Sequence, residues 1–201
     1  DLTSTENLSK GKLCELSTRS TILDAFSDQA VLAGNQIVGS LILDDETAAL
    51  GVTLNSLGEN PVIESSETLG GDKFQALNGA LSKNGIILTV PDHVEVKQPI
   101  VIVHWAGSGG SFPQLHVEAG LHARLHLVEI YFSIGDEAGF NVASTRIRAR
   151  AGSHVSRSVI RNWNVDTTAV HLEHLMVHRD AYLQSTNLNI NGGTLRQETV
   201  L

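Results

Sequence analysis

Short apolar runs, separated by glycines and polar turns, dominate the second half of the chain. Beyond Gly85 these runs have the length of β-strands, and residues 86–201 show no convincing helical period. The runs are IILTV, PIVIVHW, LHLVEIYF, RSVIRNW and LNIN. Residues 1–85 mix helix, strand and turn signals. We therefore predict an N-terminal α/β region at residues 1–85 and a β region at residues 86–201.

One helix is predicted at the end of the first region, over residues 72–83. Its apolar face is formed by Phe74, Leu77 and Leu81. Asp72 is the expected N-cap, and the Asn-Gly pair at residues 84–85 the expected end. Earlier, two apolar runs around the Gly-Asn pair at residues 34–35 predict a hairpin over residues 30–43. Further short strands are expected at GVTL and PVIES.

The β region repeats itself roughly every 30 residues. The first column of the repeat is Val90, Val117, Ala149 and Val177. The turn-like column three residues later is His93, Gly120, Gly152 and Asp180. A repeat of this length, made of strands without helices, is typical of a coil of β rungs stacked in parallel about 4.8 Å apart. The sequence thus predicts a parallel β-helix with about four rungs.

This alignment predicts particular neighbours on adjacent rungs. Glu118 is expected beside Arg150, and Glu129 beside Arg161, because parallel stacking favours opposite charges. A ladder of mostly planar side chains is expected at His104, Tyr131, Trp163 and Asn191. These pairs test the register directly.

The charge and the cysteine content of the chain argue against several kinds of ligand and site. The 201 residues carry a net charge of −8, and residues 1–85 hold 12 acids against 5 bases, which argues against nucleic acid as a ligand. Arg146, Arg148 and Arg150 share one side of a predicted strand, where we expect pairing with acids across strands. The single cysteine, Cys14, excludes an internal disulfide and a cysteine-only cluster site. Apolar runs stay shorter than the roughly 18 residues of a membrane-spanning helix.

Nine histidines, all between His93 and His178, invite a metal hypothesis. On a strand, His174 and His178 would lie about 13 Å apart, too far for one metal. The alignment places His122 beside His154, the best pair. Partly exposed polar positions on the outside of the rungs explain all nine more simply. We assign no catalytic, cofactor-binding or metal-ligating residue.

Several motifs, in order, resemble the SufB/SufD family of the SUF iron–sulfur cluster assembly system, and SufD more closely than SufB. The stretch ALNGALSKNGIILTVPDHVEVKQPIVIVHW resembles the start of the family's β-helix core. Its matching positions are Leu77, Asn78, Ala80, Gly85, Ile87, Val90, Pro91, Val94, Val96, Pro99 and Ile100. Two later stretches, HVEAGLHARLHLVEIYFS and LNINGGTLRQETVL, resemble its rungs, the second through a double-glycine turn with Gly192, Gly193 and Arg196. The resemblance covers residues 72–201.

The resemblance implies a right-handed parallel β-helix, preceded by a small α/β region and continuing beyond Leu201. It also implies a non-catalytic scaffold that assembles with SufB-like and SufC-like (ATPase) subunits in the cytoplasm, or in the plastid of a plant. The assembled complex would handle the cluster, with no cofactor bound by this chain alone. Neither nucleic acid nor a membrane is an expected partner, and a homodimer stays open. The family's functional positions have no counterpart here, so none is carried over.

The alternative is an enzyme, a β-helix or cupin-like protein that acts on carbohydrate or a small acid. Such β-helix enzymes line a groove with acids. The acids between residues 96 and 165 are Glu118, Glu129, Asp136 and Glu137. The first two already have expected arginine partners, and the chain has no His-x-His of the cupin type.

Overall fold

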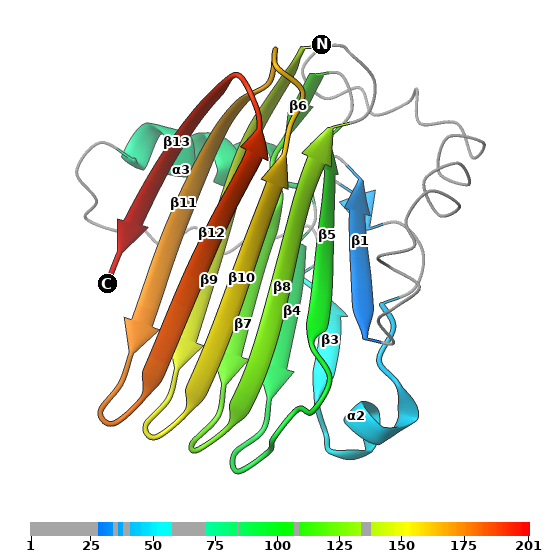
Figure 1. Ribbon diagram of the computed structural model, residues 1–201, viewed down its shortest axis with the longest axis vertical. Helices are drawn as coiled ribbons and strands as arrows, with labels where there is room; N and C mark the ends of the chain where they lie inside the picture. The colour runs from blue at the N-terminus through cyan, green and yellow to red at the C-terminus, as the bar shows by residue number, and fades with distance from the viewer. Residues whose placement is uncertain are drawn as a thin grey trace.

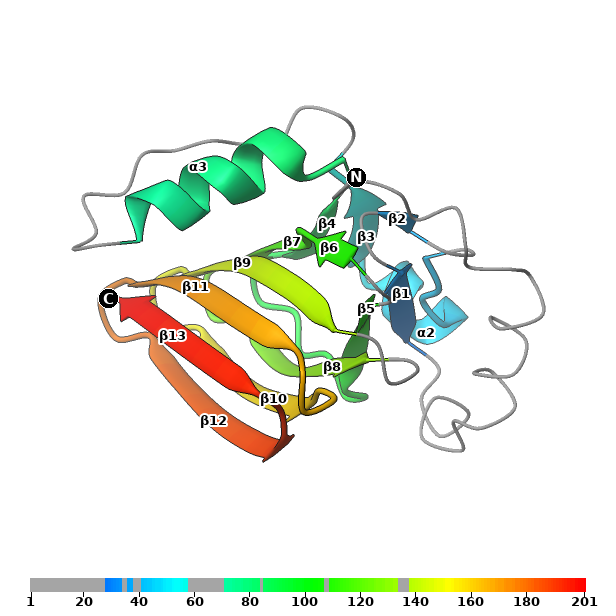
Figure 2. The same ribbon diagram turned by 90° about the horizontal axis from the view of Figure 1, so that it is seen from above.

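Two β-sheets face each other in the computed structural model, which describes residues 28–33, 36–37, 41–57, 71–83, 85–106, 109–133 and 138–201 (Figures 1 and 2). Sheet A has the order β12-β10-β8-β5-β1-β2, and sheet B has the order β13-β11-β9-β7-β4-β3. Sheet A contains β1 (Gln29–Ala33), β2 (Gln36–Ile37), β5 (Ile100–Ala106), β8 (Arg124–Ser133), β10 (His154–Asn162) and β12 (Tyr182–Asn191). Sheet B contains β3 (Thr53–Ser56), β4 (Gly85–Val90), β7 (Gln114–Ala119), β9 (Gly139–Ala149), β11 (Thr168–Val177) and β13 (Thr194–Val200).

From β4 onward the chain passes back and forth between the sheets. Each long strand pairs in parallel with the strand one rung earlier, as in β5–β8–β10–β12 and β7–β9–β11–β13. The short β6 (Gly109–Ser111) also pairs in parallel with β9. This is a mainly β, parallel solenoid of about four turns, which confirms the predicted fold class.

The predicted register is wrong by two residues at several steps. Val90 pairs with Ala119 and not with Val117. Glu118 lies opposite Arg148, with a shortest N–O distance of 3.3 Å, and not opposite Arg150. A shift of two residues keeps every side chain on its own face of a strand, so the apolar pattern cannot detect it. The register is correct where β5 meets β8, where β9 meets β11 at Ala149 and Val177, and where β10 meets β12 as far as Arg161.

The observed register follows the corners of the solenoid. One corner column has left-handed backbone in each rung, and its members are His93 (φ 63°), His122 (φ 56°), Gly152 (φ 69°) and Asp180 (φ 58°). The predicted alignment placed Gly120 in this turn-like column, three residues after Val117. A Cβ at Gly120 would lie 2.6 Å from the backbone of Asp92, so this glycine serves close packing between rungs and not a positive φ.

The helix α3 (Asp72–Leu81) lies across the outer face of sheet B (Figure 2) and confirms the predicted helix. Its buried Asn78 donates to the carbonyls of Pro113 (3.2 Å) and Val142 (2.6 Å) and accepts from Gln114 Nε2 (2.8 Å). Its apolar side chains pack against Phe112, Val142, Val170 and Leu172. The expected N-cap is wrong, because Gly71 takes that position without a side-chain hydrogen bond and Asp72 lies in the first turn.

Strands β1, β2 and β3 extend the two sheets at the N-terminal end. β1 pairs in parallel with β5 and antiparallel with β2, which confirms the predicted hairpin, and β3 pairs antiparallel with β4. The sequence did not predict α2 (Asp45–Ala49), where the Asp44 side chain accepts from the Thr47 amide at 2.6 Å. Cys14 and the PVIES run lie outside the described residues. The division of the chain at Gly85 stays a prediction.

Candidate functional site: a charge network inside the solenoid

Four charged side chains are buried between the two sheets. Their exposed fractions are 0% for Glu129, 1% for Arg157, 0% for Arg161 and 4% for Glu173. They come from β8, β10 and β11, and each points inward from its strand. We call these four residues, with His104, Tyr131 and His171, the interior network. A buried charge is costly unless a partner compensates it, so the contacts of the network decide what it can do.

Glu129 accepts hydrogen bonds from three buried side chains. Its Oε1 accepts from Arg157 Nε at 2.5 Å, and its Oε2 accepts from the hydroxyls of Tyr131 (2.8 Å) and Thr145 (3.2 Å). Burial acts to raise the pKa of the Glu129 carboxyl, but the charge and hydrogen bonds of Arg157 outweigh it, and the net shift is downward. Burial likewise acts to lower the pKa of Arg157, and Glu129 reverses that effect. The two groups therefore form an ion pair.

Glu173 joins both arginines to the last strand. Its Oε1 accepts from Arg157 Nη1 at 2.8 Å and lies 3.5 Å from Arg161 Nη2. Its Oε2 accepts from Gln197 Nε2 (3.0 Å) and Thr199 Oγ1 (2.8 Å), both on β13. Both buried carboxylates thus accept hydrogen bonds from at least three side chains, which is typical of a structural ion-pair network.

Arg161 has mostly neutral partners. Its Nε donates to His171 Nδ1 at 3.0 Å, and its Nη1 donates to the side-chain carbonyls of Asn187 (2.8 Å) and Asn189 (3.3 Å). Burial lowers the pKa of this guanidinium, against the opposing effects of Tyr131 and Glu173. Arg161 is thus the less well compensated of the two buried cations.

Two histidines lie beside the Tyr131 ring and are uncharged. The His104 ring stacks on it with centroids 4.2 Å apart, and the His171 ring meets its edge at 4.5 Å. Burial lowers the pKa of His104 to about 4. Burial, followed by the charge of Arg161, lowers the pKa of His171 well below its usual range. For these two residues the expectation of partly exposed histidines is wrong, since each is 2% exposed.

The expected His122–His154 pair does not form. His154 lies opposite Arg124 in the observed register, and its ring contacts Tyr182, with centroids 6.0 Å apart. His122 instead stacks on His93, with centroids 5.2 Å apart. The described residues contain no group of three or more His, Cys, Asp or Glu side chains that could hold a metal ion.

The two charge pairs predicted from the sequence, Glu118–Arg150 and Glu129–Arg161, are not observed, and each acid contacts another arginine. Glu129 lies opposite Val159 and binds Arg157, while Arg161 lies opposite Tyr131. The expected cross-strand pairing of arginines with acids is confirmed on the outside of sheet B, where Arg148 contacts Glu118 and Arg150 contacts Asp92 at 3.6 Å. The strand conformation considered for His174 is confirmed in β11, which ends at Val177, one residue before His178.

A signal for the interior network was present in the sequence. In β10, Arg157 and Arg161 alternate with Val155 and Val159 in steps of two, so all four point to the same, inward face. The sequence reasoning missed this because charged residues are almost never fully buried unless paired. The partners, Glu129 and Glu173, lie on other strands and emerge only with the correct register.

Residues 102–201 match the family model described as SUF system FeS cluster assembly, SufBD core domain. A search of curated proteins found no match. None of the helices in the described part of the chain is long and apolar enough to cross a membrane. The matched residues begin inside β5 and continue through β13, so they cover the rungs that build the interior network. The match therefore supports a place for this chain in the SufB/SufD family of the SUF iron–sulfur cluster assembly system.

Proposed function

We propose that the protein is a non-catalytic scaffold subunit of a SufBCD-type complex for iron–sulfur cluster assembly. The observation that carries the proposal is the SufBD core match, which spans the solenoid from β5 to β13. The sequence motifs favour a SufD-like subunit over a SufB-like one. We expect SufB-like and SufC-like subunits as partners and the cytoplasm as the location.

The chemistry of the interior supports a structural role for this chain. Both buried carboxylates are held by arginine and hydroxyl donors, and the two histidines beside Tyr131 are uncharged. This arrangement holds neighbouring rungs together through side chains, in addition to the hydrogen bonds between their backbones. We propose that the assembled complex handles the cluster, with no cofactor bound by this chain alone. Nothing in the described residues favours the enzyme alternative.

Co-purification tests the proposal. The full-length protein carrying an affinity tag is co-expressed with the SufB-like and SufC-like subunits of its own organism, and the captured material is sized by chromatography with light scattering. We expect one complex that contains all three chains. An unrelated tagged β-solenoid serves as the negative control. Recovery of the full-length protein alone, or as a homodimer without the other two subunits, would contradict the scaffold proposal.

A further inference from the structure

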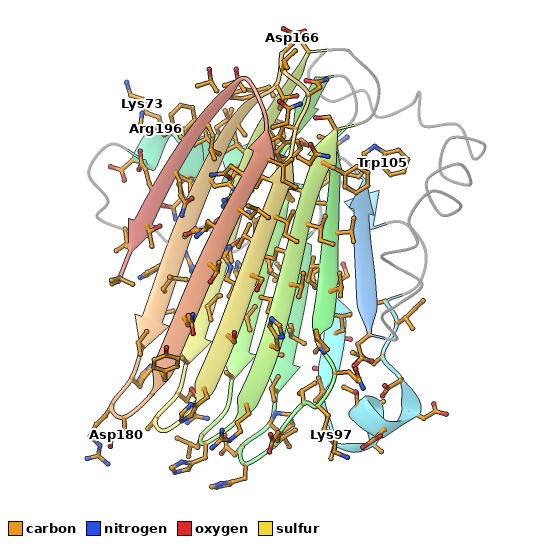
Figure 3. The ribbon with its side chains drawn as sticks, viewed as in Figure 1. Lys73, Lys97, Trp105, Asp166, Asp180 and Arg196 are labelled. Carbon is orange, nitrogen blue, oxygen red and sulfur yellow. The ribbon has the colours of Figure 1, made fainter. Side chains whose placement is uncertain are left out.

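We propose that His93 and His122, at two successive corners of the solenoid, bind a divalent transition metal ion of the copper, nickel or zinc class between their imidazoles. His93 follows β4, and His122 lies between β7 and β8. Both corners lie at the end of the strands that carries Lys97 and Asp180 (Figure 3). The ion is an exchangeable ligand and not a resident cofactor, so this inference goes beyond the scaffold role and does not depend on it.

The register of the rungs gives the two histidines equivalent places. β4 and β7 end opposite each other, at Val90 and Ala119, and each histidine lies three residues further along the chain. Their backbone amides donate to the carbonyls of Leu121 (2.7 Å) and Ala151 (3.0 Å) on the following rung. The two side chains therefore start about one rung spacing apart, about 4.8 Å. Residues i and i+4 of a helix are separated by a similar distance, about 5–6 Å between Cβ atoms, and two histidines at that spacing bind zinc in metalloproteases.

The two imidazoles are close together and accessible. Their rings stack with centroids 5.2 Å apart and planes at 18°, and both residues are exposed. In the described part of the chain, neither imidazole makes a hydrogen bond or an ion pair, so no such contact has to be broken before a metal binds. Imidazole nitrogens bind zinc at about 2.0–2.1 Å. We expect rotation of the exposed rings to bring one nitrogen of each to that distance from a shared ion.

The backbone of this corner does not by itself require histidine. His93 (φ 63°) and His122 (φ 56°) are left-handed, and Asp180 is the other non-glycine residue with a positive φ in the described ranges. The third rung has Gly152 at the same corner, and glycine takes this conformation at lower cost than a residue with a side chain. Strained backbone is an observation from which a function can be inferred. Here the two strained histidines are also the two that stack.

The third rung provides space and not a third ligand. A Cβ at Gly152 would lie 2.3 Å from Nδ1 and 2.5 Å from Cε1 of His122, so the glycine leaves room for that ring. The carboxylate of Asp92 already accepts from the Leu121 amide at 2.7 Å and contacts Arg150 at 3.6 Å. Because the described residues hold no group of three or more side chains that could bind a metal ion, water completes the coordination of the ion.

Copper(II) is the probe, because it binds sites of this kind more tightly than nickel or zinc. The full-length protein, without a histidine tag, is titrated with the iminodiacetate chelate of Cu²⁺, which leaves room for two further ligands and so favours paired imidazoles. Calorimetry gives the affinity, and electron paramagnetic resonance gives the number of imidazole nitrogens on the ion. We expect one saturable site with two imidazole nitrogens.

His93→Asn and His122→Asn are the test variants, because asparagine tolerates left-handed backbone but has no imidazole. Each is expected to weaken copper binding by about tenfold or more, since the second imidazole no longer acts at high effective concentration. The double variant should bind little more weakly than either single variant. Thermal unfolding, followed by circular dichroism, shows that each variant is folded.

His178→Asn is the matched control. His178 is an exposed histidine in the turn after β11, at the same end of the strands, and its removal should leave the copper affinity unchanged. Three results would each overturn the proposal: unchanged affinity in either test variant, an equal loss in His178→Asn, or a single imidazole nitrogen on the ion bound to the unsubstituted protein.

Discussion

In sheet A, the early rungs of the solenoid bury mainly aliphatic side chains, whereas the later rungs place charged and amide side chains at the same inward positions, with Arg157 and Arg161 buried and the amides of the last rung exposed. Three inward columns of sheet A show the change. They are Ile100–Leu127–Arg157–Ser185, Ile102–Glu129–Val159–Asn187 and His104–Tyr131–Arg161–Asn189. The backbone pairing stays parallel along all three columns. Backbone hydrogen bonds hold neighbouring rungs together. Charged and polar side chains can therefore replace aliphatic ones in the interior without a change of fold.

The two interiors differ in how they tolerate change. In the aliphatic part, the loss of a methyl group leaves a small void. In the polar part, the loss of one partner leaves a buried charge without compensation, which costs much more than the intact pair contributes. The later rungs therefore depend on a few specific contacts, and the earlier rungs on total packed volume.

The largest effect is expected for Glu129→Ala, which leaves the Arg157 guanidinium without its 2.5 Å partner. We expect a loss of about 3–5 kcal/mol in the free energy of unfolding, measured by urea denaturation. The control is Glu118→Ala, since the Glu118–Arg148 pair is partly exposed and should be worth about 0–1 kcal/mol. Equal losses in the two variants would remove the distinction between the interior and the surface.

An intermediate effect is expected for the pH dependence of stability, because His104 and His171 are buried without charge. The folded-state pKa of His104 is about 4, below the ordinary 6.5, so between these values the unfolded chain takes up a proton that the folded chain does not. The free energy of unfolding therefore falls as the pH falls through this window, by up to about 1.4 kcal/mol per pH unit for each such histidine.

His104→Phe tests this origin of the pH dependence. Phenylalanine keeps a planar ring beside Tyr131 and removes two nitrogens that have no hydrogen-bond partner. We expect the slope of stability between pH 6 and pH 5 to fall by the contribution of one proton, with little loss of stability at pH 7. The carboxyl of Glu129, whose pKa is lowered, contributes at lower pH, below the ordinary value of 4.5. An unchanged slope in His104→Phe would show that His104 is charged in the folded state.

The smallest effect is expected for Ile102→Val, one rung before Glu129 in the same column. Ile102 is fully buried, and the loss of one methylene group should cost about 0.5–1.5 kcal/mol in urea denaturation. Because no charge is left uncompensated, the loss should be the same at pH 7 and pH 5. A loss as large as that of Glu129→Ala would show that the early rungs also depend on specific contacts.

Local patterns were sufficient to predict much of the architecture. The 3.6-residue spacing of Phe74, Leu77 and Leu81 predicted α3, and the repeat predicted a parallel solenoid. The His104–Tyr131 neighbours were also predicted, and their rings stack. The N-cap of α3 was not, because a glycine occupies it and makes no side-chain hydrogen bond. Each success relied on spacing along one segment, where the helical or strand period is a direct consequence of backbone geometry.

The alternation of residues along each strand determined which side chains face inward. Because this alternation has a period of two, the inward face of a strand could be identified without knowing how the rungs are aligned with one another. The same period could not distinguish a shift of two residues, so Glu129 was assigned to Arg161 and not to Arg157. The tertiary structure determines which arginine pairs with Glu129, through the geometry of the corners and through contacts between strands far apart in the sequence. The burial of Arg157 and Arg161 was decided in the same way, because a charge enters an interior only where partners from other strands compensate it.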